Sequence, residues 1–219
     1  MALAMLGAFS GCSNTGDGGS ASGGSDSDTI RIGGLAPLTG DAASYGVAVN
    51  NAIQMAVEDI NANGGIDGKQ IEYIYYDEKG DTTEATNAYN KLVQDDKVVA
   101  IIGDVTTKPT LAVAQTSQQD NIPIITATAT AAEVTLTGPN IFRACFTDPF
   151  QGELMASYAS EKLGATKVAV LSDMADDYSS GIAEAFVAKA EELGMQVVAD
   201  EKYQDGDVDF KSQLTNIKG

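Results

Sequence analysis

The segments IIGDVTTKPT (101–110) and IPIITATAT (122–130) each place a short apolar run before a cluster of hydroxyl side chains. In an open parallel sheet, ligands bind beyond the carboxyl ends of the strands, so both clusters are expected at one such edge. Because these ends offer hydroxyls and backbone amides but almost no titratable group, they favour binding of a small polar molecule over acid–base chemistry. The hydroxyls belong to Thr106, Thr107, Thr126, Thr128 and Thr130.

From Thr29 onward, strand-like apolar runs alternate with amphipathic helical runs. This alternation predicts an α/β fold of parallel sheets flanked by helices. Strands are expected at 30–36, 70–76, 98–102, 122–127, 141–144, 168–172 and 196–203. Helices are expected at 45–61, 82–94, 148–162 and 182–193, and a further helix is expected to begin at residue 210.

Several of these helices carry start signals. Asp81 and Glu84 have the spacing of a capping box, and Ser44 is able to cap the first helix. Asp148 followed by Pro149 predicts a cap and a first-turn proline. Along 45–61, apolar residues recur on one side and predict a single buried helix face that includes Ile60, with Asn50 outside it on the solvent side.

The composition of the 219-residue chain excludes several functions. Its net charge is -18, with 13 basic and 31 acidic residues, so it lacks the clustered cations that nucleic acid binding requires. There is no histidine, which removes the commonest general base and a common transition-metal ligand. Neither nucleic acid nor a metal or other cofactor is therefore expected as a partner.

The N-terminus resembles the end of a lipoprotein signal. Residues 1–12, MALAMLGAFSGC, end in a cleavage box whose Cys12 would carry the lipid, and an apolar tail with a chance cysteine is the alternative. No Lys or Arg precedes Cys12, so the signal is expected to begin further upstream. Residues 13–28 contain only small and polar side chains and predict a flexible tether to the membrane.

Signatures of common enzymes are missing from the sequence. It contains no GxxxxGK[ST] phosphate loop, no GxSxG elbow and no CxxC motif. The acidic pairs 95–96 and 176–177 are interpreted as solvated faces, and Cys145 as a small buried hydrophobic residue. We therefore expect a protein that is not an enzyme.

The loops after the first, third and fourth predicted strands carry the binding hypothesis. The first loop, PLTGDAASYG (37–46), ends with Tyr45 close to the cleft. In the second, the free amides of a helix start beside the Thr107 hydroxyl can hold a carboxylate, and Pro109 fits the first turn. The third loop contains Thr128 and Thr130. Each threonine taken alone is equally well explained as a structural cap.

The order of these pieces resembles the type 1 periplasmic binding proteins, in particular the leucine/isoleucine/valine-binding proteins of ABC importers. The resemblance extends from about residue 30 to 219. It is carried by IGxxxPLTGxxAxYG (32–46), DINAxGGIxG (59–68), YYD (75–77), IIG (101–103), IPIITAxAT (122–130) and FRxxxxDxxQG (142–152).

The resemblance implies two lobes that close on an amino acid, with Thr107 on its carboxylate and Thr130 on its ammonium and carboxylate groups. Thr128 would add main-chain contacts beside Thr106. Tyr45 and Tyr178 would form the mouth, one from each lobe. The family's acidic ammonium partner is expected beyond Gly219, and its first-lobe disulfide is absent because Gly80 and Thr106 occupy those positions.

Lobe 1 is assigned to 29–146 and part of lobe 2 to 147–219, and the second lobe is expected to continue beyond this chain, which would weaken ligand binding. The resemblance implies a monomeric, extracytoplasmic lipoprotein that captures a branched-chain or other aliphatic amino acid for an ABC transporter permease. The alternative is an amide-sensing or amino-acid-sensing domain of the same fold.

Overall fold

Strand β1 (Thr29–Ala36) lies inside a five-stranded parallel sheet of order β2-β1-β3-β4-β5. The computed structural model describes residues 29–218. From β1 the chain runs outward to β2 (Gln70–Asp77) and then crosses to β3 (Ala100–Ile102), β4 (Ile124–Thr126) and β5 (Ile141–Arg143). The order therefore reverses between β1 and β3, and in parallel sheets this switch point opens a crevice at the carboxyl ends of the strands.

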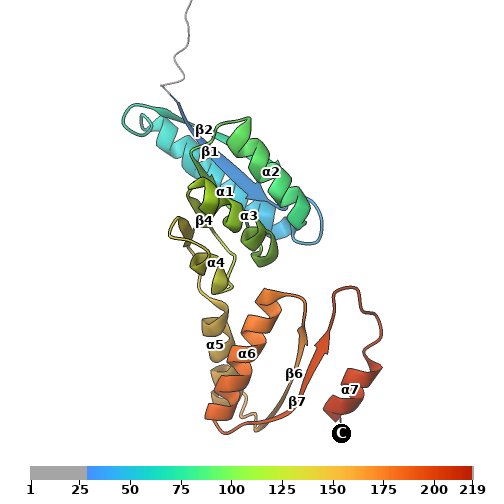
Figure 1. The fold of residues 1–219 in the computed structure, drawn as a ribbon. Helices are drawn as coiled ribbons and strands as arrows, with labels where there is room; N and C mark the ends of the chain where they lie inside the picture. Colours follow the sequence, from blue (N-terminus) through green and yellow to red (C-terminus); the bar gives the residue numbers. More distant parts are fainter. Residues whose placement is uncertain (1–28, 219) are drawn as a thin grey trace, which may run out of the picture.

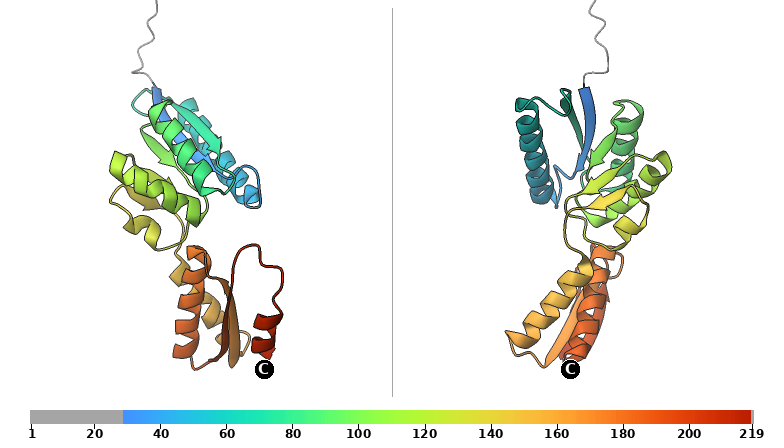
Figure 2. Two further views of the ribbon diagram at one scale, coloured as in Figure 1. Left: turned by 45° about the vertical axis from the view of Figure 1, so that its right-hand side comes forward. Right: turned by 90° about the vertical axis from the view of Figure 1, so that its left-hand side faces the viewer.

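Helices cover this first sheet (Figure 1). Helix α1 (Ala43–Ala62) packs on one face, opposite α2 (Thr82–Gln94) and α3 (Thr107–Asp120), and the short α4 (Glu133–Leu136) precedes β5 (Figure 2). The main core lies between the sheet and the α2–α3 pair. It includes the fully buried side chains of Leu35, Tyr89, Leu92, Ile101, Val113 and Ile124.

A second, smaller unit follows β5. Strands β6 (Lys167–Asp173) and β7 (Gln196–Tyr203) form a two-stranded parallel sheet, and α5 (Asp148–Glu161) packs along α6 (Asp177–Glu192). Ala156, Ala190 and Met195 form its small core, and α7 (Lys211–Lys218) lies against β7. We call the elements β1–β5 with their helices the first lobe, and α5–α7 with their strands the second lobe (Figure 1).

The predicted α/β class is confirmed, and each predicted strand and helix is present. Strands β3 and β4 are shorter than predicted, and α6 begins five residues before the predicted start at 182. Asp176 explains that earlier start, because its side chain caps α6 by accepting a hydrogen bond from the Ser179 amide at 3.1 Å. Within residues 29–218 no helix is both long and apolar enough to cross a membrane.

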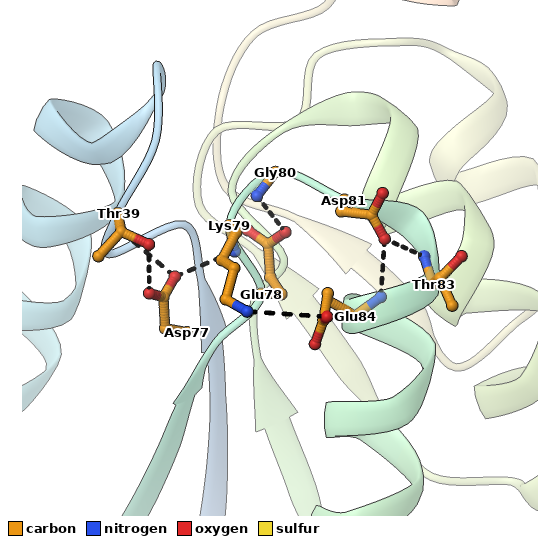
Figure 3. Close-up of polar contacts among 8 residues, drawn as sticks. All are labelled: Thr39, Asp77, Glu78, Lys79, Gly80, Asp81, Thr83 and Glu84. Carbon is orange, nitrogen blue, oxygen red and sulfur yellow. Dashed lines mark hydrogen bonds and ion pairs between the residues drawn. The ribbon is translucent and has the colours of Figure 1, made fainter.

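Three predicted caps have different outcomes. Asp81 caps α2 as expected, accepting hydrogen bonds from the Thr83 and Glu84 amides at 2.8 and 2.9 Å (Figure 3). Ser44 does not cap α1, because that helix already begins at residue 43 and takes Ala42 as its N-cap. Asp148 lies inside the first turn of α5 and the N-cap position belongs to Thr147, so that prediction is also wrong.

Candidate ligand-binding site

A cleft of about 620 Å³ opens where the loops after β1, β3 and β4 meet the start of the second lobe. The first-lobe walls lie at the carboxyl ends of these strands, on both sides of the switch point between β1 and β3. Every residue predicted for the cleft lines it: Tyr45, Thr106, Thr107, Thr128, Thr130 and Tyr178.

The start of α3 forms the polar end of the cleft. Thr107 is the first residue of this helix, is 5% exposed and lines the cleft beside Lys108 and Pro109. In the described part of the chain no hydrogen bond involves the Thr107 hydroxyl. The first amides of a helix have no intrahelical acceptor and carry the positive end of its dipole. Together these donors can hold a carboxylate without an arginine.

Thr130 connects the cleft to the second lobe. Its side chain is largely buried, and its carbonyl accepts a hydrogen bond of 3.0 Å from the Asp148 amide at the start of α5. The Asp148 carboxyl is buried, and neither of its oxygens is hydrogen-bonded in good geometry within residues 29–218. Burial raises the pKa of Asp148, while the nearby Thr130 hydroxyl and the Arg143 guanidinium act in the opposite direction.

The hydroxyls of Thr126 and Thr128 serve the protein itself. Thr126 is fully buried and donates to the carbonyl of Asp104, and Thr128 donates to the carbonyl of Val105. These two hydrogen bonds join the loop after β4 to the loop after β3. The Thr128 hydroxyl is therefore already engaged with the protein, although Thr128 lines the cleft.

Aromatic side chains form the mouth. Tyr45 on α1 is 65% exposed and Tyr178 on α6 is 41% exposed, so both retain much of their surface for a partner. Phe146 also lines the cleft and packs against Phe150 with ring centroids 6.2 Å apart. Such rings supply an apolar surface for a ligand side chain.

Sequence reasoning missed several cleft residues. Asp176 was assigned to a solvated acidic face, yet it is half-buried, caps α6 and lines the cleft. Its capping position before a helix was the signal that could have identified it. Gly80, Gln151 and Phe146 were also missed, since only the tertiary arrangement brings them to the cleft.

The cleft offers little reactive chemistry. Cys145 lines it, but burial raises the pKa of the thiol, which disfavours the nucleophilic thiolate. Its sulfur donates to the Ala129 carbonyl at 3.5 Å. Within residues 29–218 no three Asp, Glu or Cys side chains cluster in a way that could hold a metal ion.

A family model described as periplasmic binding protein matches residues 29–219. The chain belongs to the periplasmic binding protein family. This periplasmic binding protein is 35% identical over 190 residues to the Leu/Ile/Val-binding protein BraC3 of Rhizobium johnstonii, a match that covers 86% of this chain and 51% of the relative. The chain thus spans about half the length of the curated relatives it matches.

Solved structures of the family share this architecture. The branched-chain amino acid transporter substrate binding protein LivJ of Streptococcus pneumoniae, solved with isoleucine, is 40% identical with a TM-score of 0.79, covering 87% of this chain and 54% of that one. A solute binding protein of Rhodopseudomonas palustris, solved with 3,4-dihydroxy benzoic acid, is 28% identical with a TM-score of 0.76, covering 87% and 52%. The resemblance stated from the motifs is confirmed.

Proposed function

We propose that this periplasmic binding protein captures an amino acid with an aliphatic side chain and delivers it to the permease of an ABC importer. The observation that carries the proposal is the start of α3, where the buried Thr107 and the first residues of the helix line the cleft. Isoleucine and 3,4-dihydroxy benzoic acid, the ligands of two similar proteins, both contain a carboxylate. The carboxylate is the chemistry that these two ligands share, and we assign the carboxylate of the ligand of this chain to the start of α3.

The remaining contacts are assigned in the same proposal. Thr130 contacts the ammonium and carboxylate groups, the backbones of Thr106 and Thr128 border the carboxylate, and Tyr45 and Tyr178 cover the ligand from opposite lobes. Affinity comes from charge-assisted hydrogen bonds in a cleft that excludes water, and no bond is made or broken.

The cellular setting belongs to the proposal as well. We assign 29–146 to lobe 1 and 147–219 to part of lobe 2 of a monomer that acts outside the cytoplasm. Cys12 carries the lipid anchor and 13–28 form the tether, and both lie outside the described residues. The absence of hydrolysis of any bound amino acid or amide would agree with a transport role.

Isothermal titration calorimetry with L-isoleucine and L-leucine tests the function. L-leucinamide and isoamylamine, which lack the carboxylate, are the matched ligands and are expected to bind at least tenfold more weakly. Benzoate tests whether the carboxylate alone is sufficient. Equal affinity for leucine and isoamylamine would contradict the carboxylate site, and the absence of binding to every amino acid would overturn the proposed substrate class.

A further inference from the structure

Two acidic side chains lie fully buried behind the cleft wall. Glu78 follows β2, Asp104 follows β3, and each is 0% exposed. One oxygen of each is satisfied by the backbone. Oε2 of Glu78 accepts from the Gly80 amide at 2.7 Å (Figure 3), and Oδ1 of Asp104 accepts from the Val105 amide. The other two oxygens, Oε1 of Glu78 and Oδ2 of Asp104, have no donor within residues 29–218.

Glu78 and Asp104 follow the two strands that flank β1 in the sheet, and the Glu78 amide donates to the Ala36 carbonyl at the end of β1 at 3.3 Å. Each of the two carboxyl groups also affects the pKa of the other. Burial is the largest cause that raises the pKa of each group, and the charge of Glu78 raises the pKa of Asp104 further. Two ionised carboxylates offer only acceptors to each other. A single proton between them supplies the donor that both orphaned oxygens lack and removes one buried charge.

Among residues 29–218, the charged groups around the two carboxyl groups do not replace the proton. Asp77 adds negative charge beside Glu78, and the amide of Asp81 lies near the same carboxyl. Lys79 points away and pairs with Glu84 at 3.7 Å, at the surface (Figure 3). No Lys or Arg in the described part of the chain forms an ion pair with either buried carboxyl.

We propose that Glu78 and Asp104 share one proton and that the resulting carboxyl–carboxylate hydrogen bond positions the cleft wall. It joins the loop after β2, which contributes Gly80 to the cleft, to the loop after β3, which contributes Val105 and the start of α3. The Thr126 hydroxyl holds the backbone of Asp104 from the opposite side. The shared proton thereby fixes the loop that presents the donors of α3.

Proton sharing rests on the burial of both carboxyl groups and on their two unpaired oxygens. Only its effect on affinity rests on the proposed function. When the proton leaves at high pH, two buried negative charges repel each other and the loops separate. The free energy of unfolding therefore falls as the pH rises from about 4, the ordinary carboxyl pKa, to the raised pKa of the pair. Affinity for L-isoleucine falls over the upper part of the same range.

Carboxyl ¹³C NMR of the unaltered protein, titrated from pH 4 to 9, tests the proton directly. We expect Glu78 and Asp104 to retain one protonated carboxyl between them at neutral pH, and the infrared band of a protonated acid to be present. In Glu78→Gln and in Asp104→Asn the amide supplies the donor, so this band disappears and the remaining carboxyl is ionised. Two fully ionised carboxyls in the unaltered protein at pH 7 would overturn the proposal.

The pH dependence of unfolding and of ligand binding provides the second test. In the unaltered protein, ionisation of the pair lowers the unfolding free energy above pH 4. Glu78→Gln is expected to lack this decrease, whereas the surface control Glu84→Gln is expected to show it. The affinity of Glu78→Gln for L-isoleucine is expected to be independent of pH up to 9, while that of Glu84→Gln weakens as in the unaltered protein. Parallel pH profiles for both variants would contradict a positioning role. If isoleucine does not bind at any pH, only the proposed function is contradicted. The NMR titration still determines whether Glu78 and Asp104 share a proton.

Discussion

The Asp148 amide donates a 3.0 Å hydrogen bond to the Thr130 carbonyl, so the loop after β4 and the first turn of α5 are fixed to each other. This bond connects the polar end of the first-lobe sheet to the first helix of the second lobe. It places the buried Asp148 carboxyl close to the Thr130 hydroxyl and the Arg143 guanidinium. The Arg143 Nη1 donates to the Ala131 carbonyl and so holds the same loop.

Replacing Asp148 by Asn should flatten part of the pH dependence of stability. Because burial raises the pKa of Asp148 in the folded protein, this group favours folding most when protonated, below about pH 4. Its contribution is lost as the pH rises through the raised pKa. Urea unfolding at pH 4, 5, 6 and 7 is expected to show a smaller decrease for Asp148→Asn than for the unaltered protein. A steeper decrease would contradict this reading of the buried carboxyl.

Replacing Thr107 by Val removes one hydroxyl from the start of α3 and keeps the shape of the side chain. We expect affinity for L-isoleucine to fall about tenfold, or about 1.4 kcal/mol, because a charge-assisted hydrogen bond to the carboxylate is lost. The exposed Thr83 on α2, which lies outside the cleft lining, provides the matched control Thr83→Val. An equal loss in both variants, measured by calorimetry, would remove Thr107 from the carboxylate site.

Thr126→Val tests the connection between the loops after β3 and β4. The Thr126 hydroxyl donates to the Asp104 carbonyl and accepts from the Ala129 amide at 3.0 Å, and the side chain is fully buried. Valine would leave both backbone groups unsatisfied, so the free energy of unfolding is expected to fall by about 2 kcal/mol in urea. A change below about 0.5 kcal/mol would show that water or a shifted loop replaces these bonds.

Local sequence patterns were sufficient to predict the sheet, because apolar runs of strand length and helical periodicity are properties of neighbouring residues. These patterns failed where a feature depends on contacts between residues that are far apart in the sequence. The α1 face predicted to be buried is partly open: Ile60 is 37% exposed, and it borders an apolar groove of about 640 Å³ over β3–β5. Asn50, on the side predicted to face solvent, is buried and accepts a 2.9 Å hydrogen bond from the Tyr73 hydroxyl.

The same limit applies to the site. Strand-end threonines were predicted to face the cleft because topology alone sends the carboxyl ends of parallel strands to one edge. Which hydroxyls remain available there depends on partners in another loop, and the Thr128 hydroxyl is already bonded to the Val105 carbonyl. The meeting of Glu78 with Asp104 depends on the strand order, which places β1 between them, and no local pattern reports that order.

Two of the three capping predictions, Asp81 and Ser44, provide a matched pair of substitutions. Asp81→Ala removes the acceptor of the Thr83 and Glu84 amides, and we expect the free energy of unfolding to fall by about 1 kcal/mol. Ser44→Ala changes a residue that lies within α1 and makes no capping bond, so its effect should remain within about 0.5 kcal/mol and favour the helix. Urea unfolding of both variants distinguishes a cap from a cap-like sequence. A loss of about 1 kcal/mol in Ser44→Ala would mean that Ser44 caps a helix beginning at Tyr45, as the sequence alone predicts, and would contradict the start at Ala43.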